Sequence, residues 1–188
     1  MFCTPHPTSR ELVSPSKRGK LYPRQRVFSA TEFFSNQGSY KVKYMTDLEI
    51  AKTELYEENL TLAIVKDGSL LYSTKSHRIS GFLDAIDKCG ENLKGASLAD
   101  RVAGKAIALL CAYAKMSEVY AAVMSRKALE IYKQNRITCH WQTLVDNVLD
   151  QTRAAMCPFE KAAAEIQEPE KAFRTFRIML ESHKPAKL

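Results

Sequence analysis

The segment MCPFEKA places a cysteine immediately before a proline at the start of a helical run. Proline is favoured at the first position of a helix, so Pro158 places Cys157 at the N-cap. Free N–H groups and the helix dipole stabilise a thiolate there and lower its pKa. Glu160, three residues further on, is positioned to cap the backbone or to hold a proton. Cys157 is therefore a candidate nucleophile, the alternative being an inert thiol that serves as a poor helix cap.

A second group of candidates lies in the segment GASLADRVAGKAIALL. Its pattern predicts one helix from an N-cap at Ser97 to about residue 114, with Asp100 at the third helical position. Gly104 would cost up to about 1 kcal/mol inside that helix, which suggests close approach by a neighbouring helix or a ligand. Lys105 interrupts an apolar stretch, so it either binds an anion or acts as a base in a pocket, or it extends to solvent. Asp100 is either catalytic or a capping residue.

Ser125 stands between a β-rich run at 118–124 and a helix that we expect to reach about residue 135. Such junctions carry ligand groups in α/β sheets, although simple N-capping explains a serine equally well. All of these assignments require the side chains to meet in one cavity. The candidate catalytic residues are Cys157, Lys105 and Asp100, and the candidate ligand-binding residues are Gly104, Ser125 and Glu160; no metal and no cofactor is expected.

The surrounding elements alternate between helices and strands. Thr46 and Glu49 form a capping box that opens a helix over 46–58, and Asp67-Gly68 predicts a hairpin turn. A helix over 79–89, strands at 118–124 and 137–141, and two C-terminal helices follow. This order predicts a three-layer α/β/α sandwich with a mixed sheet.

Charge is concentrated at the N-terminus. The chain has 188 residues and a net charge of +7. Residues 1–44 hold eight basic and two acidic residues, which leaves 20 basic and 19 acidic residues in the body. Nucleic-acid binding is therefore not expected of the folded domain. No apolar run is long enough for a membrane span, and five cysteines without a C-x-x-C pair favour a reducing, cytoplasmic setting.

The composition divides the chain into three segments. Residues 1–44 are rich in basic residues and proline, and we interpret them as a disordered extension. Two alternatives stay open, translated sequence upstream of the natural start and a targeting peptide. Met45, directly before the capping box, is a candidate initiator. Residues 45–166 form the α/β domain, and residues 167–188 form a C-terminal amphipathic helix and tail.

The segments LAIVKDGSLLYS, LKGASLADRVAGKAIALL, EVYAAVMSRKALEIY and MCPFEKA resemble the family of domains of unknown function numbered 1893. The resemblance covers Leu60 to Ala164 and leaves the last helix outside. It implies a cytidine-deaminase-like fold. Zinc deaminases of that fold begin one helix with H-x-E and the next with P-C-x-x-C. This chain has Asp100-Arg101-Val102 and Ser125-Arg126-Lys127 at the expected positions, which argues against a zinc site.

Two functional hypotheses follow. The first is a metal-free enzyme that binds a small metabolite or nucleotide-like ligand, with Cys157 as nucleophile. The second is a non-catalytic module that senses a ligand or assembles with itself. The expected partners are a small molecule whose identity the sequence does not give and, under the second hypothesis, further copies of the chain in a homo-oligomer.

Overall fold

The structure, a computed structural model, describes residues 45–76, 79–150 and 155–182. The predicted extension over 1–44 lies outside the described residues. In chain order the elements are α1 (Asp47–Glu57), β1 (Leu62–Lys66), β2 (Ser69–Thr74), α2 (Ser80–Cys89), a 3-10 turn (Gly90–Leu93), β3 (Ser97–Ala103), α3 (Lys105–Tyr113), β4 (Glu118–Ser125), α4 (Arg126–Gln134), β5 (Thr138–Val145), α5 (Pro158–Ala163) and α6 (Pro169–Ser182).

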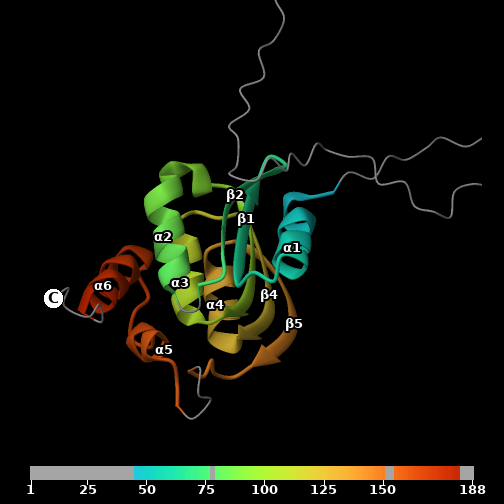
Figure 1. The fold of residues 1–188 in the computed structure, drawn as a ribbon. Helices are drawn as coiled ribbons and strands as arrows, with labels where there is room; N and C mark the ends of the chain where they lie inside the picture. The colour runs from blue at the N-terminus through green and yellow to red at the C-terminus, as the bar shows by residue number, and fades with distance from the viewer. Residues whose placement is uncertain (1–44, 77–78, 151–154, 183–188) are drawn as a thin grey trace, which may run out of the picture.

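The five strands form one mixed sheet in the order β2-β1-β3-β4-β5. The pairs β2–β1 and β1–β3 are antiparallel, whereas β3–β4 and β4–β5 are parallel. Helix α1 packs on one face, and α2, α3 and α4 lie on the other, with α5 and α6 outside α3 (Figure 1). This arrangement confirms the predicted α/β/α sandwich with a mixed sheet.

Two local sequence signals are confirmed at the start of the fold. Thr46 accepts a hydrogen bond from the Glu49 N–H while the Glu49 carboxylate accepts one from the Thr46 N–H, as a capping box requires. Asp67 and Gly68 both have positive φ, at 51° and 74°, in a two-residue hairpin loop between β1 and β2. Asp47 accepts hydrogen bonds from both of their N–H groups, which fixes α1 against the hairpin turn.

One prediction is wrong in a way that changes the site. The segment from Ser97 to Ala103 is strand β3 rather than the start of a helix, and α3 begins only at Lys105. Strand β3 lies in the middle of the sheet, between β1 and β4. The backbone hydrogen bonds of two neighbouring strands and burial on both faces outweigh the helix propensity of its alanine and leucine residues.

The core has two parts, separated by the sheet. The larger part fills the space between the sheet and α2, α3 and α4, and extends to Phe176 of α6. The smaller part lies under α1 and includes Leu55 and Tyr120. Arg101 joins α1 to β3 on this side, because its guanidinium donates hydrogen bonds to the backbone oxygens of Leu60 and Leu55.

Candidate functional site

The carboxylate of Glu160, in α5, lies at the N-terminus of α3. Its Oε2 accepts a hydrogen bond from the Lys105 N–H at 2.9 Å, and its Oε1 accepts one from the Ala106 N–H at 2.8 Å. Both N–H groups belong to the first turn of a helix, where they have no intrahelical acceptor. The Glu160 side chain is therefore the N-terminal cap of α3, although it comes from an element 55 residues further along the chain.

Gly104 makes room for this carboxylate. It is the N-cap residue of α3, with an extended backbone at φ −96° and ψ −177°. A Cβ at this position would lie 2.2 Å from Glu160 Oε1 and 2.4 Å from the carboxyl carbon, well inside van der Waals contact. The sequence interpretation of Gly104 as a place of close approach is right, but the glycine lies before the helix and the approaching group is a side chain of the same protein.

Lys105 also joins α3 to α5, but here α3 supplies the side chain and the C-terminal end of α5 supplies the backbone acceptor. Its side chain is buried, and its Nζ donates a hydrogen bond to the backbone oxygen of Ala164 at 2.8 Å. Ala164 is the C-cap of α5, where unsatisfied carbonyls and the negative end of the helix dipole favour a cation. Lys105 is thus held inside the protein by a backbone acceptor and does not extend to solvent.

Burial raises the pKa of Glu160, and this effect exceeds the opposing ones. The hydrogen bonds from the α3 N–H groups lower the pKa, as do the positive charges of Lys127 and Lys105. Lys127 was not a candidate from sequence; its place in the first turn of the helix after β4 is the signal that would have indicated it. The carboxylate thus has two N–H donors and faces two cations, which is the chemistry of an anion-binding site.

Ser125 serves as the N-cap of α4. Its hydroxyl is fully buried and accepts a hydrogen bond from the Ala128 N–H at 3.1 Å. The parallel strands β3 and β4 therefore both lead into helices whose starts are already capped, one by Glu160 and the other by Ser125. The Glu160 carboxylate lies at the carboxyl end of β3, the edge where ligand groups gather in α/β sheets.

Asp100 was predicted at the third position of a helix and is instead a buried residue of β3. Its Oδ1 accepts a hydrogen bond from the Val102 N–H at 2.9 Å. Burial raises the pKa of Asp100 to about 7. Burial is the main cause of the raised pKa values of Cys111 and Tyr132, and the charge of Asp100 adds to both, so Asp100 faces the α3–α4 side of the sheet. Asp100 and Lys105 therefore belong to a strand and to the helix after it, and not to the single helix that the sequence predicts.

Cys157 is the N-cap of α5, as the sequence predicts, and Pro158 occupies the first helical position. The residue is partly exposed, and its side chain makes no capping hydrogen bond. Glu160 does not cap α5, because its carboxylate is engaged at α3. His140, the histidine nearest Cys157 in sequence, lies on β5 with its Nε2 3.2 Å from Glu118 Oε1.

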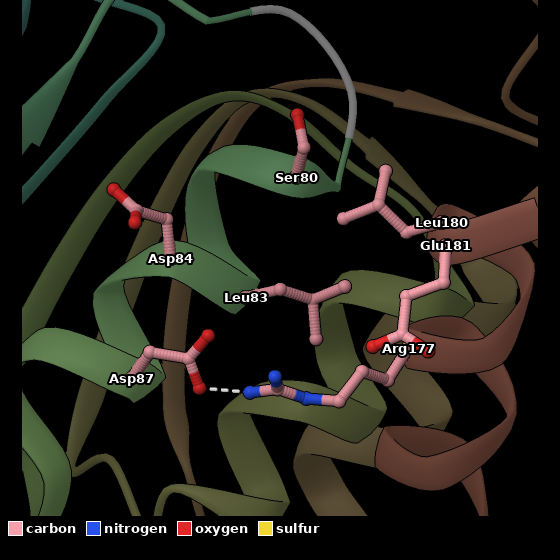
Figure 2. Close-up of a pocket in the computed structure, with 7 residues that line it drawn as sticks. All are labelled: Ser80, Leu83, Asp84, Asp87, Arg177, Leu180 and Glu181. Carbon is pink, nitrogen blue, oxygen red and sulfur yellow. Dashed lines mark hydrogen bonds and ion pairs between the residues drawn. The ribbon is translucent and has the colours of Figure 1, made fainter. Parts of the chain in front are cut away.

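A shallow hollow of about 260 Å³ lies elsewhere, between α2 and α6 (Figure 2). Arg177 of α6 reaches across it to form an ion pair with Asp87 of α2, and Leu83 and Leu180 form its apolar wall. None of the residues predicted from the sequence lines this hollow. Its two aspartates and Glu181 belong to exposed helix surfaces, and we assign it no function.

Neither helix start carries the zinc-deaminase residues. Helix α3 begins Lys105-Ala106 and α4 begins Arg126-Lys127, where H-x-E and P-C-x-x-C would be required. Among the described residues, no three histidine, cysteine, aspartate or glutamate side chains gather in a way that could hold a metal ion. No helix in the described part of the chain is both long and apolar enough to cross a membrane.

The sequence profile of a domain of unknown function, DUF1893 (TM1506), matches residues 50–180. The chain belongs to the DUF1893 family. This match extends the resemblance seen in the sequence to include α6. A crystal structure of a DUF1893 family protein, TM1506 from Thermotoga maritima, has 23% sequence identity, a TM-score of 0.65, and coverage of 79% of this chain and 99% of its own. The DUF1893 relative therefore shares the fold across its whole length.

Two solved structures of Acinetobacter baumannii RibD are less similar. One has 20% identity and a TM-score of 0.39 over 45% of this chain, and the other has 19% identity and a TM-score of 0.37 over 58%. This chain covers 28% and 31% of those RibD chains. Among curated proteins, none matches this DUF1893 chain.

Proposed function

We propose that this DUF1893 protein is a metal-free sensing module for a small anionic metabolite, with a nucleotide-like phosphate or a carboxylate as the chemical class. The observation that supports it is the position of the Glu160 carboxylate at the N-terminus of α3, which we call the seat of Glu160. Two α3 N–H groups, a glycine cradle and the charges of Lys105 and Lys127 surround an anion that belongs to the protein itself. A ligand with a phosphate or carboxylate group would exchange with Glu160 and release α5 from α3.

In this proposal four of the six predicted residues have a role in the exchange, Glu160 being the group that is displaced. Gly104 admits the anion, Lys105 anchors the end of α5 until the ligand arrives, and Ser125 keeps the start of α4 in place beside the site. The free thiols of the four described cysteines fit a reducing cytoplasmic setting, which we include in the proposal.

The test compares the wild-type chain with Glu160→Ala, which empties the seat. Inorganic phosphate and a nucleoside monophosphate are the probes, and sodium chloride at matched ionic strength is the reference. A ligand that binds only the folded state raises the melting temperature according to its concentration relative to Kd. We expect a larger phosphate-dependent rise for Glu160→Ala than for wild type. If neither protein responds to either anion beyond the chloride reference, the proposal is wrong.

The second candidate function is catalysis with Cys157 as nucleophile, Lys105 as anion clamp and Asp100 as proton carrier. The observation that favours it is a partly exposed cysteine at the N-cap of α5. This hypothesis requires a thiol that reacts faster than an unperturbed one, because the thiolate is the nucleophile. The rate at which iodoacetamide alkylates Cys157 measures this reactivity.

A further inference from the structure

Strand β5 is an exposed edge strand of the sheet. It pairs with β4 on one side, and no other described strand pairs with its second side. The side chains of His140, Trp141, Gln142 and Thr143 are all exposed, and Trp141 retains 42% of its surface. Parallel strands are normally covered on both faces, so the exposure of four consecutive residues is a departure from the rule.

The free side of β5 offers backbone hydrogen-bonding groups at alternate residues. Thr138 directs its N–H toward β4, where it bonds to the oxygen of Ser117 at 3.1 Å. The register with β4 stays constant along the strand, so even-numbered residues face β4 throughout. Cys139, Trp141 and Thr143 therefore direct their N–H and C=O groups to the free side, as an edge strand does.

The sequence of β5 lacks the features that normally protect such an edge. Edge strands are usually short, or carry lysine or proline, or are interrupted by a bulge. The strand TCHWQTLV has eight residues and contains no lysine, no proline and no acidic residue. The nearest charges are outside it: Arg136 is exposed before the strand, at a left-handed turn with φ 57°, and Asp146 is exposed after the strand, where it pairs with Arg126.

We propose that β5 pairs antiparallel with β5 of a second copy of this chain, which joins the two sheets into one of ten strands. A two-fold axis through Trp141 pairs each outward-facing residue with another, Cys139 with the partner's Thr143 and Trp141 with the partner's Trp141. The same register brings Arg136, just before the strand, close to the partner's Asp146 at both ends of the strand pair, where that aspartate would add a second cation to its pair with Arg126. Opposite charges in these positions favour a second copy over other occupants of the edge.

This inference is independent of the anion site, because none of its residues contacts Glu160 or α3 in the interactions described above. It has one consequence for side chains. The two Trp141 rings lie on the same face of the joined sheet at a hydrogen-bonded pair, where aromatic cross-strand contacts contribute to stability. The exposed area of Trp141 is then a contact surface, and not a surface presented to water.

Sedimentation equilibrium of the full chain tests the assembly. We expect wild type at twice its 21.2 kDa mass. Trp141→Lys sets two like charges against each other on the axis, and Thr143→Pro removes an outward N–H without touching the bonds to β4. Both variants should sediment as monomers with an unchanged far-ultraviolet circular dichroism spectrum. Ser69→Lys, which adds the same charge to exposed β2 at the other edge, is the control and should remain dimeric.

A disulfide tests the register. Opposed residues in a hydrogen-bonded antiparallel pair have Cα atoms about 5.5 Å apart, within reach of a disulfide. Trp141→Cys should therefore cross-link to itself between two copies under mild oxidation, as peptide mapping would show, whereas Ser69→Cys should not. A monomeric wild type at high micromolar concentration overturns the proposal. So does a dimer that survives both β5 substitutions, or one in which Trp141→Cys fails to cross-link.

Discussion

The carboxylate of Glu160 occupies the space that a side chain on Gly104 would fill. A Cβ on residue 104 would lie 2.2 Å from Oε1 of residue 160, so the carboxylate can reach the α3 N–H groups only because the N-cap is glycine. The two residues are far apart in sequence and come from different layers of the fold. Their contact joins the C-terminal helices to the part of the sheet where parallel strands lead into helices.

Replacing Glu160 with glutamine should destabilise the fold by about 2 kcal/mol, because one buried N–H of α3 loses its acceptor and faces an amide N–H₂ instead. Urea denaturation measures the change. Glu165→Gln is the matched control, since Glu165 is exposed on the same segment, and it should change the free energy of unfolding by less than about 0.5 kcal/mol. Equal effects of the two substitutions would contradict the capping role.

Gly104→Ala should also destabilise the protein, because the added methyl group displaces the Glu160 carboxylate from its seat. A double-mutant cycle gives the sharper result. Both single substitutions damage one contact, so Gly104→Ala combined with Glu160→Gln should cost less than the two single changes added together. Strict additivity would show that the alanine acts through the backbone and not through Glu160.

The Asp100 carboxyl should make stability depend on pH. Its pKa is about 7 in the fold against an ordinary value of 3.8, so the folded chain holds the proton more tightly than the unfolded chain does. The stabilising contribution is present below pH 3.8 and is lost as the pH rises toward 7. The slope approaches about 1.4 kcal/mol for each pH unit inside that window.

Asp100→Asn removes this titration while keeping a hydrogen-bond acceptor for the Val102 N–H. The variant should therefore be more stable than wild type at pH 8, and the advantage should shrink toward pH 4. Urea denaturation of both proteins across this range is the measurement, and the difference between the two curves isolates Asp100 from other carboxyls. A difference that is independent of pH would mean that Asp100 is ionised in the fold.

Cys157 should react with iodoacetamide before the other described cysteines. Burial raises the pKa values of Cys89, Cys111 and Cys139, and Cys111 is fully buried. Mass spectrometry after timed alkylation at neutral pH gives the order, which we expect to end with Cys111. The absolute rate separates the two functions. Catalysis requires the alkylation rate of Cys157 to exceed that of a model thiol with a pKa of about 8.5. An equal rate would rule out the catalytic function and would be consistent with the sensing function.

Sequence reasoning succeeded where the determining contacts are local. The capping box of Thr46 and Glu49 spans three residues, and the turn at Asp67-Gly68 depends on two backbone conformations. Cys157 and Ser125 were placed correctly at helix starts for the same reason. Family resemblance then identified the DUF1893 family, and the alternation of elements gave the sandwich.

It failed at β3 because the determining contacts there are distant. Ser97 and Asp100 fit a helix-start pattern, yet pairing with β1 and β4 makes the segment a strand. A pattern read along one chain does not include those neighbours. The cap of α3 was missed for a related reason, because a carboxylate 55 residues away supplies it. The interruption of the apolar run at Gly104 and Lys105 correctly indicated a point of close approach, but it did not indicate that Glu160 is the approaching residue.

The arm formed by α5 and α6 has a consequence for synthesis of the chain. All five strands of the described residues precede it, so a nascent polypeptide that ends after β5 already contains every strand of the described sheet. Helix α3 would then start with bare N–H groups, and the surface that Phe176 covers would face water. The domain can therefore close only after α6 has left the ribosome, and a chain that stops between β5 and α5 exposes apolar surface that favours aggregation.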